Sequence, residues 1–273
     1  MRQLAALLLA SLLPLLGACA SNQGHDSART AFASEPPARS GDVMAFPGPR
    51  TGLAGRTLRV SAMADIRLAR NEVVLTFDDG PVPGKTEAIL DILDRRGVKA
   101  TFLMVGSMAR AHPEIARKVA ARGHAIGSHT QNHKNLAGLG FDRAVDEIAQ
   151  GRQSVAAALI PTTSRPAPFF RFPYLSDTPA LRRHLAMKGV VIIDVDVDSK
   201  DYFQSSGDQV RERTLAALER RGSGIVLLHD LHLRTVAMLP SLLDELDRRG
   251  FKVVDLQPDI APVGGLLVSQ ANR

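Results

Sequence analysis

The chain has 273 residues, which is enough for one large domain or two small ones, and its 45% hydrophobic and 23% charged residues are ordinary for a globular protein with a full core. Its net charge of +6 suits either an anionic partner or a basic surface in contact with solvent. Two Tyr, ten Phe and no Trp are not interleaved with basic residues, which argues against binding of single-stranded nucleic acid. The single cysteine, Cys19, excludes disulfides and thiolate metal ligands elsewhere.

An export signal is predicted over residues 1–18. Arg2 supplies a short basic start, and the apolar run over residues 4–16 is too short to span a bilayer. Small residues follow this run, as they do at signal cleavage sites. We therefore expect a protein of the bacterial cell envelope.

The sequence Leu-Gly-Ala-Cys at residues 16–19 resembles the lipobox of bacterial lipoproteins. The resemblance implies cleavage before Cys19, acylation of that residue and a lipid anchor in a membrane. Because Ala20 is not the Asp that often retains lipoproteins in the inner membrane, we expect the outer membrane, facing the periplasm. The alternative is a plain secretory signal with an incidental cysteine.

Residues 19–70 are expected to form a flexible tether. The stretch is polar, rich in Pro and Gly, and lacks a sustained apolar period, so it cannot bury enough surface to offset its ordering entropy. Whether part of residues 56–68 packs on the domain is left open. The functional domain is expected over residues 71–258, followed by a tail over residues 259–273.

From residue 72 onward, short apolar runs alternate with amphipathic segments. Strands are expected at residues 73–77, 100–105, 125–126, 169–172, 190–197, 225–228 and 251–254. Helices are expected at residues 86–95, 113–122, 141–159, 179–187, 208–221 and 235–249. The alternation predicts an α/β domain with about seven parallel strands, and both a barrel and an open sheet fit that number.

Five joins between a helix and the next strand share a basic last helical turn followed by glycine. Cations suit the negative end of the helix dipole, and glycine accepts the left-handed conformation that ends a helix. The glycines are Gly97, Gly123, Gly189, Gly222 and Gly250. We expect functional sites at the opposite joins, where strands end and helices begin.

Two adjacent carboxylates, Asp78 and Asp79, end the first expected strand in the sequence Thr-Phe-Asp-Asp-Gly-Pro. Neighbouring side chains of a strand point to opposite faces, so the two can have different roles. Taken alone, however, the motif is more typical of a turn, because Asp, Gly and Pro are common turn formers.

A histidine pair, His129 and His133, follows the third expected strand. A spacing of four places both rings on one face of a helical turn, although such a pair is often accidental. With Asp79 they would supply two imidazoles and one carboxylate, which leaves open coordination positions for a catalytic metal and a bound water of lowered pKa.

Two further strand ends carry polar residues. Arg171 could clamp a carboxylate such as Asp78 and fix its orientation, or it could be a surface residue beside a turn. His229 ends the run at 225–228 and could protonate a leaving group, but His232 lies close enough to be an alternative.

In order and spacing, these segments resemble the five motifs of the polysaccharide deacetylases of the NodB-homology group, carbohydrate esterase family 4, over roughly residues 71–256. The motifs read Thr-Phe-Asp-Asp-Gly at 76–80, His-Thr-x-x-His at 129–133, Arg-x-Pro-Tyr at 171–174, Asp-x-x-Asp-Tyr at 198–202 and Leu-His at 228–229. The resemblance implies a distorted (β/α) barrel of about seven parallel strands. It also implies hydrolysis of N-acetyl groups on an N-acetylglucosamine polysaccharide, such as peptidoglycan or chitin oligosaccharide, with a divalent metal that is usually zinc and sometimes cobalt.

The same resemblance implies a role for each matching residue. Asp78 matches the catalytic base and Arg171 the residue that orients it. His229 matches the general acid and Asp201 the carboxylate that tunes it. The remaining matches are the metal ligands Asp79, His129 and His133, the oxyanion-binding backbone N–H of Tyr174, and Leu228 in the pocket for the acetyl methyl group. Tyr202 replaces the usual Trp beside the substrate groove, which leaves the glycan preference open.

Three rival interpretations remain. The first is an O-deacetylase acting on acetylated xylan. The second is a glycan-binding lipoprotein without activity, which would need a broken catalytic set, whereas the base, its arginine, the tuning carboxylate and the acid are all present. The third is a non-haem iron oxygenase, but that class usually places its carboxylate close to the first histidine, and Asp79 lies 50 positions before His129. No nucleic-acid or protein partner is expected.

Overall fold

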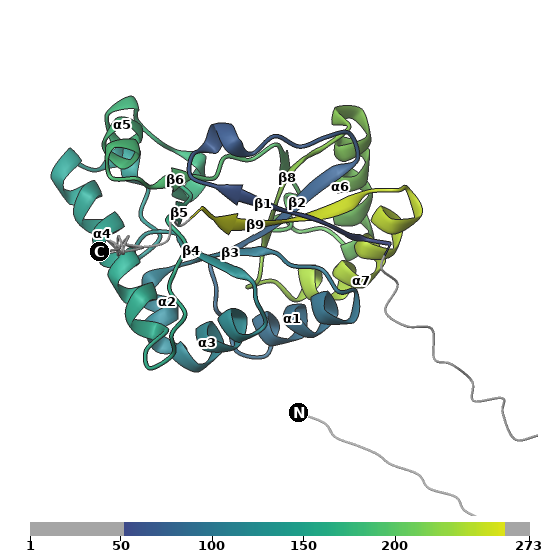
Figure 1. Ribbon diagram of the computed structural model, residues 1–273, viewed down its shortest axis with the longest axis horizontal. Helices are drawn as coiled ribbons and strands as arrows, with labels where there is room; N and C mark the ends of the chain where they lie inside the picture. The colour runs from purple at the N-terminus through teal and green to yellow at the C-terminus, as the bar shows by residue number, and fades with distance from the viewer. Residues whose placement is uncertain (1–51, 260–273) are drawn as a thin grey trace, which may run out of the picture. The chain divides into compact units, whose positions relative to one another are not determined.

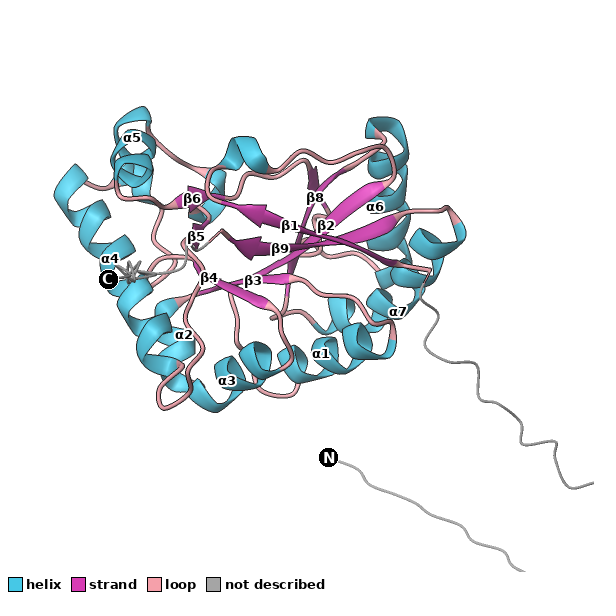
Figure 2. Cartoon of the chain, viewed as in Figure 1, coloured by secondary structure: helices cyan, strands magenta, loops and turns pink. Residues whose placement is uncertain are grey.

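The computed structural model describes residues 52–259, so the expected signal peptide, Cys19 and most of the tether and tail lie outside the described residues. All strand pairs within that range are parallel, and the helices lie outside the strands (Figures 1 and 2). The α/β class with a parallel sheet is therefore confirmed. None of the helices in residues 52–259 is long and apolar enough to cross a bilayer.

The part of the chain that the structure describes has nine strands in one sheet, in the order β1-β9-β2-β3-β4-β5-β6, with β8 paired to β2 and β7 paired to β8. The strands are β1 (Ala54–Val60), β2 (Glu72–Asp78), β3 (Thr101–Met104), β4 (Ala125–Ser128), β5 (Phe169–Phe170), β6 (Val191–Ile192), β7 (Val197–Asp198), β8 (Gly224–His229) and β9 (Lys252–Pro258). Among the described residues no strand pair joins β6 to β7, so the barrel-like sheet is not closed.

Within residues 52–259, seven α-helices pack outside these strands. They are α1 (Lys85–Arg95), α2 (Gly106–Ala111), α3 (Pro113–Ala121), α4 (Phe141–Ala158), α5 (Pro179–Met187), α6 (Gly207–Arg221) and α7 (Leu233–Arg248). Short 3₁₀ turns occupy Met63–Asp65, Leu136–Gly138 and Pro173–Leu175. Helices contact their neighbours in the order α6, α7, α1, α3, α4 and α5, which Figure 1 shows as a layer running from the right, beneath the strands, to the left.

The tether prediction needs correction at its C-terminal end. Residues 54–60 form β1 and pair with β9, while Leu53 and Val60 are fully buried. This strand could not be recognised in the sequence because it has no apolar period. It lies at the edge of the sheet and exposes most of its side chains. The folded unit therefore begins well before residue 71.

The expected strand over residues 190–197 is two strands, because the chain changes partners within it. Ile193 N–H donates to Phe170 O on β5, whereas Asp196 N–H donates to Ile225 O on β8. The run thus crosses from one ladder to the other, at the place where the sheet stays open.

Alternation along the strands separates two layers of core. On β2, Leu75 and Phe77 belong to the cluster that packs against the helices, whereas Val74 belongs to a cluster with residues of seven other strands. This second cluster is the interior of the barrel-like sheet. Thr76 and Asp78 share a face with Val74, so they point into that interior at the end of the strand.

Candidate active site

The expected metal ligands meet where β2 and β4 end. Asp79 Oδ1 lies 3.3 Å from His133 Nε2 and 3.6 Å from His129 Nε2. The potential ligand atoms of the three residues all lie within 4.8 Å of one another. The two histidines are joined by a turn, with Thr130 and His133 in the left-handed region of backbone conformation. The predicted helical turn is therefore absent, but the two rings still lie next to Asp79 as expected.

The donor set fits a divalent cation. Asp79 Oδ1 is buried and has no hydrogen-bond partner, which is costly for a carboxylate unless a cation compensates it. His129 Nδ1 donates to Arg171 O at 2.8 Å, which fixes the tautomer and leaves the Nε2 lone pair facing Asp79. Burial lowers the pKa of His129 and so favours the neutral imidazole that metal binding requires.

A buried ion pair flanks this trio on one side. The guanidinium of Arg171 donates to Asp78 Oδ1 at 2.8 Å, and the two side chains are 1% and 2% exposed. Arg171 also donates to Thr76 Oγ1 at 2.8 Å and to Ile193 O at 2.9 Å. The other carboxylate oxygen of Asp78 stays free and lies 3.9 Å from His129 Nε2. Arg171 therefore fixes Asp78 with one oxygen directed at the trio.

A second charged pair, His229 and Asp201, also approaches the trio. His229 Nδ1 is 2.6 Å from Asp201 Oδ1, and Asp201 Oδ2 accepts the backbone N–H of His229 and the hydroxyl of Thr235. Burial alone would lower the pKa of His229, but the hydrogen bond and charge of Asp201 outweigh it and raise that pKa to about 9. His229 Nε2 points back to the trio, 3.9 Å from Asp79 Oδ2.

The contacts of His229 and His232, the two histidines between which the sequence left the choice open, differ. His229 lines the cavity of the site, whereas His232 is the N-cap residue of α7, does not line the cavity, and has its ring centroid 5.9 Å from that of His229. No sequence motif marks Thr235, whose hydroxyl donates to Asp201 Oδ2 from 34 positions away.

A cavity of about 430 Å³ contains the trio. It is lined by Asp79, His129, His133, Phe172, Tyr174, Leu175, Asp198, Tyr202, Leu227 and His229. Leu228, which was predicted to line the pocket for the acetyl methyl group, does not line this cavity. Leu228 packs in the core against the helices, and Leu227 faces the cavity, because it shares the interior face of β8 with His229.

Left-handed backbone is concentrated around this cavity. Seven non-glycine residues of the described chain have positive φ, and they are Asn71, Asp79, Thr130, His133, Tyr174, Leu175 and Lys200. All but Asn71 lie in the loops that carry the site. Such residues cost free energy and persist where the surrounding structure holds them, so their clustering is typical of a functional site.

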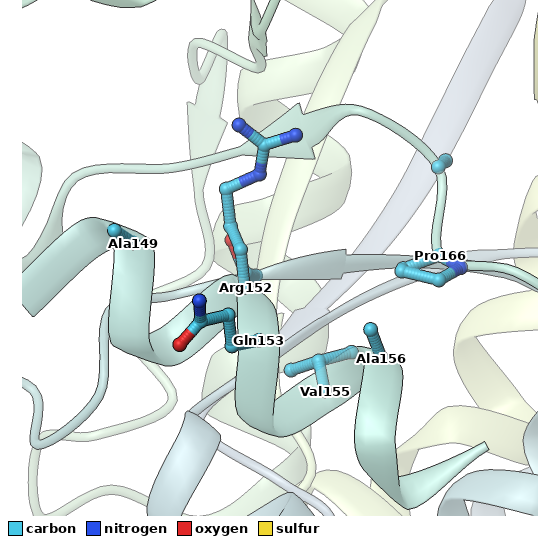
Figure 3. A pocket seen from close by; sticks show the side chains of 8 residues that line it. Ala149, Arg152, Gln153, Val155, Ala156 and Pro166 are labelled. Atoms are coloured by element: carbon cyan, nitrogen blue, oxygen red, sulfur yellow. The ribbon is translucent and has the colours of Figure 1, made fainter. Parts of the chain in front are cut away.

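A second cavity, of about 350 Å³, lies beside α4 and is shown in Figure 3. Arg152 and Gln153 contribute its long polar side chains, next to Val155 and Pro166. None of the predicted site residues lines it. The predicted metal ligands therefore lie in the cavity at the strand ends and not in this one.

Comparison with known proteins agrees with this geometry. The family model for polysaccharide deacetylase matches residues 65–193. The chain is 32% identical over 187 residues to peptidoglycan-N-acetylglucosamine deacetylase PgdA of Listeria monocytogenes, covering 67% of this chain and 38% of that protein. It is 31% identical over 195 residues to the chitooligosaccharide deacetylase of Bradyrhizobium sp. strain ANU 289, covering 66% of this chain and 87% of that protein.

A solved peptidoglycan deacetylase from Bdellovibrio bacteriovorus is also similar, with 36% identity and a TM-score of 0.69 over 77% of this chain and 61% of that one. The chain thus spans well under half the length of the Listeria relative and nearly all of the Bradyrhizobium relative. Sequence, fold and site agree, and the chain belongs to the polysaccharide deacetylase family.

Proposed function

We propose that this protein is a metal-dependent hydrolase that removes N-acetyl groups from an N-acetylglucosamine-containing polysaccharide. The observation that carries the proposal is that two groups of opposite charge both approach the trio. A fixed carboxylate, Asp78, and a protonated imidazole, His229, each approach a metal ligand to 3.9 Å. Amide hydrolysis requires a base for water and an acid for the departing nitrogen, and this arrangement supplies one of each.

A divalent cation held by Asp79, His129 and His133 would polarise the acetyl carbonyl and lower the pKa of a bound water. Zinc suits two imidazoles and one carboxylate, and cobalt is the natural substitute. The fit rests on the unpartnered Asp79 Oδ1 and on the fixed tautomer of His129.

Asp78 acts as the base. Its free oxygen accepts a proton from the attacking water, while Arg171 keeps the carboxylate from rotating. Water adds to the acetyl carbon, and the backbone N–H of Tyr174, whose residue lines the cavity, stabilises the negative charge on the carbonyl oxygen.

His229 completes the reaction as the acid. With its pKa raised to about 9, the ring carries a proton at neutral pH, and its Nε2 faces the cavity. It donates that proton to the sugar nitrogen as the C–N bond breaks, which releases acetate and a free amine. Leu227 provides an apolar wall against which the acetyl methyl group fits.

Acetate release by the purified protein tests this function. We expect release from peptidoglycan or from N-acetylglucosamine oligomers, and little or none from acetylated xylan. Asp78→Asn should abolish release, whereas Asp244→Asn on the exposed face of α7 should not change it. Release from xylan alone would establish an O-deacetylase, and no release from any polymer would favour a glycan-binding protein.

Location forms a separate part of the proposal. Cys19 lies outside the described residues, and the lipobox-like sequence supports a lipid anchor in the envelope, with the outer membrane as the expected site. Labelling cells with a fatty-acid analogue should mark the wild-type protein and not Cys19→Ser. An unlabelled, freely soluble wild-type protein would contradict the anchor.

A further inference from the structure

A cavity between α4 and α5, separate from the catalytic one, has a volume of about 290 Å³. Its apolar surface comes from both helices, and three side chains that can carry a positive charge border it. The residues that give it this character are Val145, Ile148, Leu185, Arg152, His184 and Lys188. No acidic residue lines the cavity, so it combines apolar surface with charge of one sign.

The acidic residues in the middle of α4 line a different hollow. Asp146 and Glu147 share that hollow with Arg143, so their charges are directed away from the cavity between the helices. Arg152 and Lys188, by contrast, take part in none of the ion pairs found within residues 52–259. Their positive charges are therefore available to a partner.

Helix α5 and its flanking residues add further positive charge. The segment 178–193 has no acidic residue, and its basic residues are Arg182, Arg183, His184 and Lys188. Asp177 and Asp194, just outside the segment, both pair with Arg182. Arg183 is exposed and stays outside the ion pairs of the described chain. A basic amphipathic helix of this kind is typical of a membrane-binding surface.

Exposed apolar side chains accompany these cations. Met187 is 79% exposed, the highest value among the large apolar residues of the described chain. It follows His184 by three positions, so the two side chains are neighbours on α5. The ring of Phe141, 45% exposed at the start of α4, packs edge-on against that of His184, with centroids 5.6 Å apart. Apolar side chains in such a setting can enter the interface of a bilayer while the cations stay at the headgroups.

The cavity of Figure 3 continues this surface along α4. Ala149 and Arg152 line both cavities, and no acidic residue lines either of them. In Figure 3 the side chain of Arg152 extends away from the helix, and no other labelled side chain lies beside its guanidinium. We call the area of Arg152, His184, Met187 and Lys188 the α4–α5 surface.

The chemistry of the cavity lining favours a lipid over a polypeptide. The backbone N–H groups of a bound peptide would need acceptors. Apart from the ring of His184, the side chains between α4 and α5 offer only C–H groups and cationic donors. An acyl chain needs no hydrogen bonds, and the phosphate of a lipid headgroup accepts hydrogen bonds from arginine and lysine. The lining therefore fits a lipid that carries negative charge.

We propose that the α4–α5 surface binds a bilayer that contains anionic lipids. Met187 inserts at the level of the first acyl carbons, and Arg152 and Lys188 contact the lipid phosphates. None of the residues of this surface lines the catalytic cavity, so the contact leaves the active site free. It is also independent of the anchor expected at Cys19, and it holds the folded domain itself against the membrane.

Sedimentation with vesicles measures this binding. The chain from residue 20 onward contains all described residues and lacks both the apolar run at residues 4–16 and Cys19. It should bind vesicles of equal parts phosphatidylglycerol and phosphatidylcholine, but not phosphatidylcholine alone, and salt should weaken the binding. Arg152→Gln and Lys188→Gln should each lower the partition coefficient about fivefold, the effect expected for one basic residue at an anionic surface. Arg220→Gln, which removes an exposed arginine from α6, should leave it unchanged.

A tryptophan probe tests the orientation, because the chain contains no Trp. The emission of Met187→Trp should shift to shorter wavelength with the anionic vesicles. The emission of Leu233→Trp, at a 70% exposed position on α7, should not change. An unshifted Met187→Trp spectrum, or wild-type binding by both charge variants, would overturn the proposal. Binding to poly-glutamate without binding to vesicles would also overturn it and indicate an acidic polypeptide as the partner.

Discussion

Two neighbouring carboxylates, Asp78 and Asp79, have opposite surroundings although they are adjacent in sequence. Asp78 points into the barrel interior and is neutralised by Arg171, while Asp79, with φ of 80°, turns its side chain to the two histidines. Neighbouring side chains of a strand alternate between its two faces, which explains why these two carboxylates point in different directions and could be predicted from the sequence. The left-handed backbone conformation of Asp79 could not be predicted, because nothing in the residue type requires it.

Arg171→Met should destabilise the protein strongly. The substitution keeps much of the side-chain volume but leaves the buried carboxylate of Asp78 without its partner, which costs about 3–5 kcal/mol of unfolding free energy. Urea unfolding measures this. Arg182→Met, which removes an arginine with a 38% exposed side chain from its pairs with Asp177 and Asp194, should cost less than about 1 kcal/mol. Equal costs for the two variants would show that Arg171 does not hold Asp78.

Asp201→Asn should move the alkaline limb of the pH–activity profile to lower pH. Burial lowers the pKa of His229 and Asp201 raises it to about 9, so loss of the Asp201 charge leaves the lowering effect dominant. An acid must be protonated, and activity is therefore lost as pH rises through its pKa. The profile of kcat/KM against pH measures this, with Asp177→Asn as the control. An alkaline limb that stays in place would remove His229 from the role of acid.

Among the secondary structure elements, the joins from helix to strand were the most predictable feature. All five predicted glycines have positive φ, between 64° and 88°, because a basic last turn followed by glycine is a local signal that tertiary packing does not override. The six predicted helices are present within two residues at each end. The six-residue α2 was missed, since it is too short to show a helical period.

Gly97→Ala and Gly138→Ala form a matched pair that tests the conformational part of these joins. An added Cβ meets no atom within 4 Å at either position, but only Gly97 has a positive φ, of 64°. Gly97→Ala should therefore cost about 1–2 kcal/mol, the penalty of left-handed backbone for alanine. Gly138→Ala should be neutral or slightly stabilising. Thermal unfolding compares the two, and equal melting temperatures would contradict the argument.

Strand β1 was not predicted from the sequence. Its removal directly tests whether the folded unit begins before residue 71. A protein that begins at residue 71 lacks the burial of Leu53 and Val60, which contributes at least about 3 kcal/mol relative to one that begins at residue 52. Chemical unfolding of the two forms measures the difference. Equal unfolding free energies for the two forms would show that residues 52–70 are a tether and not part of the folded unit.

At the scale of the whole molecule, the parallel sheet explains why motifs far apart in sequence could be combined. The carboxyl ends of its strands meet at one end of the barrel, so residues at the ends of β2, β4 and β8 converge without further assumptions. The supporting contacts could not be predicted. The hydrogen bonds of the Thr76 and Thr235 hydroxyls depend on packing between segments far apart in the chain. The same holds for the change of strand partner between β6 and β7.

Metal dependence tests the central claim most directly. The purified protein should bind one divalent ion per chain, lose acetate release after chelation and regain it with zinc or cobalt. His129→Ala and Asp79→Ala should lose both the ion and the activity, because each removes one of three ligands. Full acetate release by a chelated protein whose metal content is zero would contradict the account.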